Sequence, residues 1–339
     1  MVNEVSAKAK NMWQKSIVAN LALGFEPEIE YPHKWQALQR YQEAGVSYIS
    51  LHVATDATSL ERTVLTIASI TEKIKEKSEY YRVIKSPEDI LQAKLKQQLG
   101  VCFIFQGTNP IAKSLDMIDV YYQLGVRSMI LSYNIRNAVG DGCAEQTDSG
   151  LSRFGIKVIE RMNRVGMLID CSHTGYKSSM DAMGASKAPV IFSHSNVHVI
   201  APHPRNLSDE LIKACAATGG LIGINGIGVL LGDEDATLQK YVEHIDYIAQ
   251  LVGVQYVALG TDEIYFPEIM EEFLNNNSVM YPQNYSKATK PKTATGWNCI
   301  RPHQLIEIVE ILLQRGYTET DIENILGRNY LRVVQQTWC

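Results

Sequence analysis

Short apolar runs alternate with amphipathic segments along most of the chain. Several of the runs are apolar on both alternating faces, which is typical of parallel strands that are covered on both sides. This alternation is how strands joined by crossover helices look in a sequence. Eight runs predict strands: Ser16–Leu23, Ser47–Ala54, Val101–Gln106, Ser128–Leu131, Met167–Ser172, Val190–Ser193, Gly220–Asn225 and Tyr256–Gly260.

The segments between these runs carry apolar residues three or four positions apart, so they predict amphipathic helices. At Ser208 the start of a helix is well defined, because a serine can cap free backbone amides and Asp209 and Glu210 favour the positive end of the helix dipole. The clearest helical segments are Ser59–Lys77, Arg153–Val165, Ser208–Thr218 and Thr237–Val252.

Eight strand and helix units in one chain predict a closed (β/α)8 TIM barrel, of class α/β, as a single domain over residues 1–339. A nucleotide-binding Rossmann domain is less favoured, because no GxGxxG motif follows the first strand.

Residues 263–298 interrupt the alternation and are rich in Asn, Lys, Pro and Tyr. We predict a long loop after the last strand, which serves either as a lid or partner contact or as a plain surface insertion. Helical segments near Pro302–Gln314, Thr320–Leu326 and Asn329–Gln336 then close the chain, so that 302–336 is mostly helical.

The composition, with 45% hydrophobic and 20% charged residues, is that of a globular protein with a large core. A net charge of −5 gives no basic surplus for nucleic acid, and no apolar run reaches the roughly 20 residues of a membrane helix. The segment Met1–Gln14 lacks the pattern of a secretory signal, so we expect a cytoplasmic location. Six scattered cysteines without a CxxC pair predict reduced, mostly buried thiols.

Unusual polar residues follow several of the predicted strands. In a parallel barrel the carboxyl ends of all strands share one rim, so these residues are expected to converge in space. They are Gln106, Tyr133, Asn134, His173, His194 and Asp262.

His173 and His194 end consecutive strands, where two imidazoles can face one ion. A lone histidine is more commonly structural, as we expect for His52, but two matched ones together with Asp262 would suit zinc or a related divalent ion. In the His203–Asn206 loop, the guanidinium of Arg205 would match a substrate carboxylate or else tie its own loop to the barrel.

These motifs resemble the renal (microsomal) dipeptidase family of the amidohydrolase superfamily, whose members are zinc-dependent barrels. The resemblance extends from Phe105 to Asp262, nearly half of the chain. It rests on YQLGVRSMILSYN, DSGLSRFGIKVIERMNRVGMLIDCSH, APVIFSHSNVHVIAPHPRNLSDE, ATGGLIGIN and VGVQYVALGTD.

The resemblance implies a barrel of the metallo-dependent hydrolase type and a role for four matching residues. His173 and His194 would bind a zinc ion. Arg205 would bind the carboxylate of the substrate, and Asp262 would accept a proton from the attacking water.

Other family positions differ in this chain. The family's HxD pair, which holds a first zinc on the first strand, is absent from SIVANLALGF, and Gln106 stands where the family has its bridging glutamate. Tyr133 replaces a histidine that helps to polarise the substrate carbonyl, and its phenol can still donate a hydrogen bond.

We therefore expect at most one zinc ion, with Asp262 and Tyr133 as catalytic residues and Arg205, Asn134 and Gln106 as substrate-binding residues. The leading hypothesis is a dipeptidase-like hydrolase that cleaves an amide bond of a small carboxylate-bearing substrate. The alternatives are a barrel that binds such a ligand without peptidase activity, and an enzyme of altered chemistry. By analogy with the family we also consider a homodimer.

Overall fold

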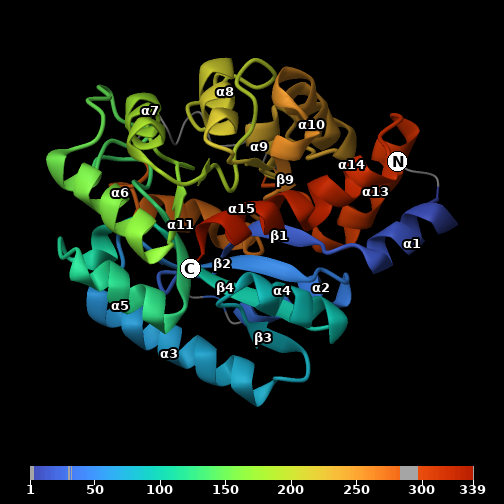
Figure 1. The fold of residues 1–339 in the computed structure, drawn as a ribbon, viewed down its shortest axis with the longest axis horizontal. Helices are drawn as coiled ribbons and strands as arrows, with labels where there is room; N and C mark the ends of the chain where they lie inside the picture. The colour runs from blue at the N-terminus through green and yellow to red at the C-terminus, as the bar shows by residue number, and fades with distance from the viewer. Residues whose placement is uncertain (1–3, 30, 32, 283–296, 339) are drawn as a thin grey trace.

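Eight parallel strands close into a barrel, as the sequence predicts (Figure 1). This computed structural model describes residues 4–29, 31, 33–282 and 297–338. The strands pair in the order β7-β6-β5-β4-β2-β1-β9-β8, and a bridge between Phe192 and Ile222 joins the two ends. The barrel strands are β1 (Ala19–Gly24), β2 (Tyr48–Thr55), β4 (Leu99–Gln106), β5 (Val126–Ile130), β6 (Leu168–Asp170), β7 (Val190–Ile191), β8 (Ile222–Ile224) and β9 (Val257–Leu259).

Each of the eight predicted runs overlaps one of these strands, so the prediction of the barrel is confirmed. A further strand, β3 (Tyr81–Val83), pairs with β4 outside the barrel order and was not predicted. Three residues are too few to show a period in the sequence.

The helices surround the barrel (Figure 1). The four clearest predicted helices are present as α3, α6, α8 and α10, and Ser208 caps α8 by accepting a hydrogen bond from the backbone nitrogen of Leu211 at 3.4 Å. The described helices are α1 (Ala7–Lys15), α2 (Lys34–Glu43), α3 (Leu60–Glu76), α4 (Pro87–Leu95), α5 (Asp116–Leu124), α6 (Arg153–Val165), α7 (Tyr176–Ala185), α8 (Asp209–Ala217), α9 (Gly228–Leu231), α10 (Leu238–Val252), α11 (Met270–Asn276), α13 (Leu305–Gln314), α14 (Glu319–Glu323) and α15 (Asn329–Thr337).

The prediction of an irregular loop over 263–298 was wrong in part. A 3-10 turn at Pro267–Ile269 leads into α11, and Met270 and Leu274 are buried. The polar composition hid this short amphipathic helix. Residues 283–296 of the predicted loop lie outside the described residues.

Two other expectations concern membranes and thiols. In the described part of the chain, no helix has both the length and the apolar character that crossing a bilayer requires. Cys102, Cys171, Cys215 and Cys299 are buried free thiols and Cys143 is partly buried, as predicted, while Cys339 lies outside the described residues.

Glycines allow β7, β8 and β9 to approach closely where the barrel closes. A Cβ atom added to Gly223 would lie 2.0 Å from the backbone oxygen of Ser193, and one added to Gly260 would lie 1.9 Å from the same atom. Backbone cannot move out of the way as a flexible side chain can. The closure of the barrel therefore depends on residues without side chains at these two positions.

We expect Gly223→Ala to lower the free energy of unfolding by at least about 2 kcal/mol, because the new methyl group overpacks the closure. Gly184→Ala is the matched control. Its position on α7 is exposed, a Cβ there meets nothing within 4 Å, and alanine should stabilise the helix by roughly 0.5–1 kcal/mol. Urea denaturation measures both changes, and a Gly223→Ala variant as stable as the parent would contradict this account.

Candidate functional site

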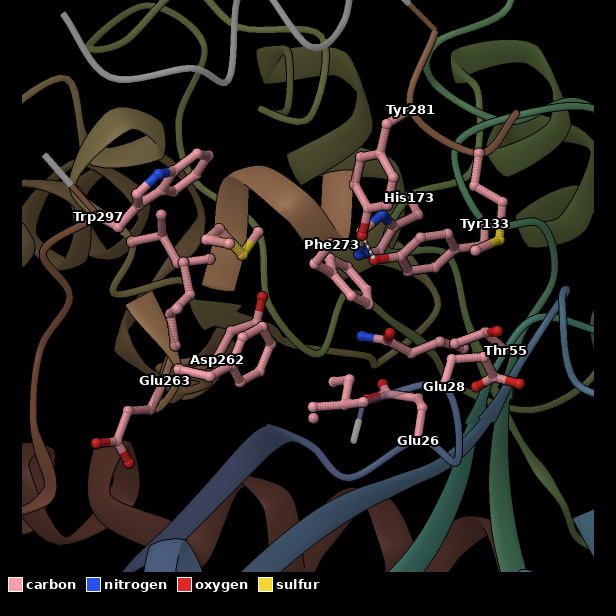
Figure 2. Close-up of a pocket in the computed structure, with 18 of the residues that line it drawn as sticks. Glu26, Glu28, Thr55, Tyr133, His173, Asp262, Glu263, Phe273, Tyr281 and Trp297 are labelled. Carbon is pink, nitrogen blue, oxygen red and sulfur yellow. Dashed lines mark hydrogen bonds between the residues drawn. The ribbon is translucent and has the colours of Figure 1, made fainter. Parts of the chain in front are cut away.

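A cavity opens at the carboxyl ends of the strands, where the predicted site residues converge (Figure 2). It holds about 850 Å³ of empty space, its open mouth included. Ile264, Phe266, Met270, Phe273 and Trp297 give it largely apolar walls. Five of the seven predicted residues line it: Gln106, Tyr133, His173, Arg205 and Asp262.

His173 and His194 face each other. They follow β6 and β7, and their Nε2 atoms lie 3.0 Å apart. Both rings are buried, and burial lowers the pKa of each well below 6.5, with the positive charge of Arg205 acting in the same direction. The two imidazoles are therefore neutral near pH 7, and the sequence-based expectation that they converge on one point is met.

Asp170, at the end of β6, holds the two histidine-bearing segments together. Its Oδ1 atom accepts hydrogen bonds from the backbone nitrogen of Ser172 at 2.9 Å and of Ser193 at 3.1 Å. These serines immediately precede His173 and His194. One buried carboxylate thus fixes the backbone next to both imidazoles.

The partners of His173 determine where its proton lies. Its Nδ1 atom is 2.6 Å from Oδ1 of Asn134, and the amide nitrogen of Asn134 donates to the backbone oxygen of Met280. Because an amide oxygen only accepts, Nδ1 carries the proton and Nε2 is left with a lone pair directed at His194. Only a proton on Nε2 of His194 or a cation can make this 3.0 Å contact favourable.

The donor set around this pair fits at most one metal ion. Two nitrogens 3.0 Å apart could share an ion, since two ligands of a tetrahedral zinc are separated by roughly 3.4 Å. Catalytic zinc sites normally have three protein ligands. Within the described residues, no third His, Cys, Asp or Glu joins the pair in a cluster able to hold a metal, so Gln106 or water would have to complete the shell.

A second ion has no ligands on β1. Asn20 occupies the middle of the strand, and its side chain is already engaged, accepting from the backbone nitrogen of Thr261 at 2.7 Å and donating to the backbone oxygen of Ala22 at 3.0 Å. The first strand therefore serves the packing of β9.

Arg205 brings a buried positive charge to the cavity wall. Its guanidinium donates to Oγ of Ser195 at 3.2 Å and to the backbone oxygen of His194 at 2.9 Å, while its Nε atom is buried without a partner. In the described part of the chain no carboxylate forms an ion pair with it. A buried guanidinium of this kind favours an anionic ligand.

Asp262 lies on the same cavity after β9. Burial raises its pKa to about 6, and the nearby charge of Arg205 and a 3.1 Å hydrogen bond from Asn225 partly oppose this rise. Its carboxyl group therefore exchanges a proton close to neutral pH, as a general base requires.

Tyr133 and Asn134 pack around His173. The ring of Tyr133 stacks on His173 with centroids 4.1 Å apart, and its hydroxyl is 2.5 Å from that of Tyr281. Asn134 does not line the cavity, because both ends of its amide are taken by His173 and Met280. The geometry gives Asn134 a positioning role, and its predicted contact with substrate finds no support in this placement.

Three of these residues have a left-handed backbone. The φ angles are +63° at Asn134, +62° at His173 and +51° at Asp262. Non-glycine residues in this region cost about 1 kcal/mol or more each, and such strain concentrates at functional sites. The fold tolerates the cost, and the backbone so shaped directs His173 and Asp262 at the cavity and Asn134 at His173.

The sequence analysis missed two residues at the site, Glu26 and Glu28, which follow β1 and line the cavity. His52, expected to be structural, lies on β2 with its ring 5.3 Å from that of His194. Burial raises the pKa of Glu26 to about 8 and lowers that of His52 to about 3. Both groups are therefore mostly neutral near pH 7, and their 3.7 Å contact is not an ion pair. The position of Glu26 just after a strand was the signal that could have found it.

Comparison with known proteins identifies relatives. The profile of the family described as Membrane dipeptidase (Peptidase family M19) matches residues 26–280. The chain is 29% identical over 278 residues to the dipeptidase verJ of Clonostachys rogersoniana and 30% identical over 251 residues to an uncharacterised dipeptidase of Schizosaccharomyces pombe. These alignments cover 81% and 72% of the chain but 65% and 53% of the two relatives, which are longer proteins.

Solved structures show the same fold. An amidohydrolase from Pseudomonas aeruginosa aligns over 97% of this chain and 99% of its own, with a TM-score of 0.83 and 26% identity. A metallo peptidase from Rhodobacter sphaeroides, liganded with a phosphinate mimic of the dipeptide L-Ala-D-Ala, aligns over 96% of this chain and 100% of its own, with a TM-score of 0.76 and 16% identity.

Proposed function

Because the chain belongs to the membrane dipeptidase family, peptidase family M19, we propose that it hydrolyses an amide bond in a small, dipeptide-like substrate with a free carboxylate. The cavity has the size and the mixed apolar and polar lining of a small-molecule site. The relative from Rhodobacter sphaeroides that holds a dipeptide mimic is consistent with a substrate of this size. The cytoplasmic location and the homodimer stay predictions from the sequence.

The buried guanidinium of Arg205 is the observation on which the proposal rests. Its unpartnered Nε atom lies within the protein, and no ion pair neutralises its charge in the described part of the chain. A substrate carboxylate would accept from this fork and hold the adjacent amide bond in a fixed place.

Asp262 is proposed as the general base. Its carboxylate takes a proton from water as the water oxygen bonds to the amide carbon, and the same proton then passes to the leaving nitrogen as the C–N bond breaks. A pKa of about 6 suits both steps near neutral pH. Tyr133 and Gln106 line the same cavity and are proposed to orient the substrate carbonyl.

His173 and His194 are proposed to hold at most one divalent ion, a zinc ion, with two protein nitrogens. Such an ion, when bound, supplies a more acidic water and a Lewis acid for the carbonyl. Their neutral state, which burial produces, leaves the lone pairs available to it.

A second candidate function is a barrel that binds a small carboxylated ligand without metal-dependent peptidase activity. The incomplete donor set around the histidine pair favours it. Retention of Asp262 at a pKa near neutrality favours hydrolysis instead. Metal content and turnover, measured on the same preparation, distinguish the two functions.

Arg205→Lys should raise KM for glycylglycine at least about tenfold, because lysine keeps the charge but loses the planar fork of donors. The unchanged protein should prefer glycylglycine to glycylglycinamide, and this preference should shrink in the variant. Arg153→Lys, at an exposed position on α6, is the matched control. Equal rates on the acid and the amide would reject Arg205 as the carboxylate site.

Asp262→Asn should lower kcat at least about 100-fold, since the amide cannot accept the proton of water. In the unchanged protein kcat/KM should increase as pH rises through about 6, because the base acts only when deprotonated. Asn225→Ala should move this acidic limb to higher pH, since the lost hydrogen bond stabilises the charged form. A flat profile between pH 5 and 7 would argue against this assignment.

Purified protein dialysed against zinc should contain no more than one ion per chain. His173→Ala and His194→Ala should each lose it, whereas His303→Ala, which removes an exposed imidazole in the turn Pro302–Gln304, should not. Elemental analysis measures the content directly. Two ions per chain, or retention of the ion by both variants, would contradict the proposed site.

A further inference from the structure

The cavity contains a second charged region that the hydrolytic residues do not use. Glu26 and Glu28 lie in the turn after β1 and both line the cavity. Figure 2 shows them beside Thr55, on the side away from Asp262, Glu263 and Trp297.

Both glutamates have a carboxylate oxygen that finds no partner among the described residues. Glu26 is 3% exposed, and its buried Oε2 atom accepts no hydrogen bond from the described part of the chain. Glu28 accepts from Oγ1 of Thr58 at 2.6 Å through Oε1, while its Oε2 atom is buried and unpartnered. Two buried acceptors without donors at the same cavity wall indicate a missing donor group.

The other two acidic residues of the cavity, Glu263 and Asp262, already interact with positively charged groups of the protein. Glu263 is neutralised by Arg40 and Arg301, each 3.1 Å away. Asp262 accepts from Asn225 and faces the charge of Arg205.

The charges near Glu26 are mostly negative. Among the described residues, the charge of Lys34 lowers the pKa of Glu26, and the ammonium group of Lys34 also donates to the backbone oxygens of Glu26 and Ile29. The charges of Glu28 and Asp262 act in the opposite direction. His52, packed beside Glu26 from β2, is neutral at physiological pH. Burial keeps Glu26 mostly protonated while no cation is bound, and a positively charged ligand at this wall would favour its ionised form and be stabilised by it.

We propose that Glu26 and Glu28 form a subsite for a protonated amine of the substrate, with their unpartnered carboxylate oxygens accepting its N–H groups. This inference rests on the proposed function, because it takes the cavity as the substrate site and Arg205 as the carboxylate site. The substrate is then a zwitterion, held by its ammonium group after β1 and by its carboxylate after β7. The rings of Phe273 and Tyr281, which line the same cavity, add surfaces that favour a cation.

Binding of two probes to the full chain tests the subsite independently of turnover. Glycylglycine has an ammonium group, and N-acetylglycylglycine lacks it but keeps the carboxylate. By calorimetry, the unchanged protein should bind glycylglycine at least about tenfold more tightly, which is the worth of one charge-assisted hydrogen bond. N,N,N-Trimethylglycylglycine, a cation without N–H donors, should bind more weakly than glycylglycine.

Substitutions that keep shape and remove charge locate the subsite. Glu26→Gln and Glu28→Gln should each weaken glycylglycine binding at least about tenfold and change N-acetylglycylglycine binding less than about twofold. Glu272→Gln, an exposed position on α11, is the matched control and should change neither affinity. Near-native thermal unfolding of both variants would confirm that they fold.

The outcomes separate the two proposals. Equal binding of the acetylated or the trimethylated probe, or parallel loss of glycylglycine and N-acetylglycylglycine binding in the variants, would overturn the amine subsite. Retained amine preference without release of glycine from glycylglycine would uphold the subsite and reject the hydrolytic function. Release of glycine from glycylglycine without a preference for the amine would uphold the hydrolytic function and reject the subsite.

Discussion

The arrangement of the site depends on one buried carboxylate, that of Asp170. It accepts from the backbone nitrogens of Ser172 and Ser193 and so ties the ends of β6 and β7 together. His173 and His194 follow these serines directly, and their 3.0 Å contact requires the two backbones to keep a fixed separation. Asp170 is not among the residues that line the cavity, yet it fixes the backbone next to both imidazoles.

The strand pattern could be predicted because every barrel strand is covered on both sides. The strands β2 and β4 are buried along their whole length, and this burial is what an uninterrupted apolar run records. β3 was not predicted because its three residues, one of them a partly buried arginine, show no hydrophobic period. α11 was not predicted for a different reason. It is a single short helix that packs only Met270 and Leu274 inward, so polar residues dominate its composition.

The candidate site was predictable where a residue's position along a strand determines its function. His173, Arg205 and Asp262 lie on the cavity as expected from the rim of a parallel barrel. Glu26 was missed because acidic residues in a turn after a strand are usually solvated, and only the fold shows that α11 and its neighbours cover this turn. The sequence also could not predict that the ring of His52 is buried and neutral. Its burial without a hydrogen-bond partner at either ring nitrogen is a property of packing, which no sequence pattern contains.

The first strand shows how the site differs from the family that the chain resembles. The first strand lacks the HxD pair that the resemblance leads us to expect, and its Asn20 accepts from both the backbone nitrogen and the hydroxyl of Thr261. Thr261 precedes Asp262, whose backbone nitrogen donates to Ala22 on the same strand and whose φ angle is +51°. The strand therefore stabilises the strained backbone of the proposed base. The amide of Asn20 and the backbone oxygen of Ala22 thus act together on the segment that carries Asp262, one through Thr261 and the other through the backbone of Asp262 itself.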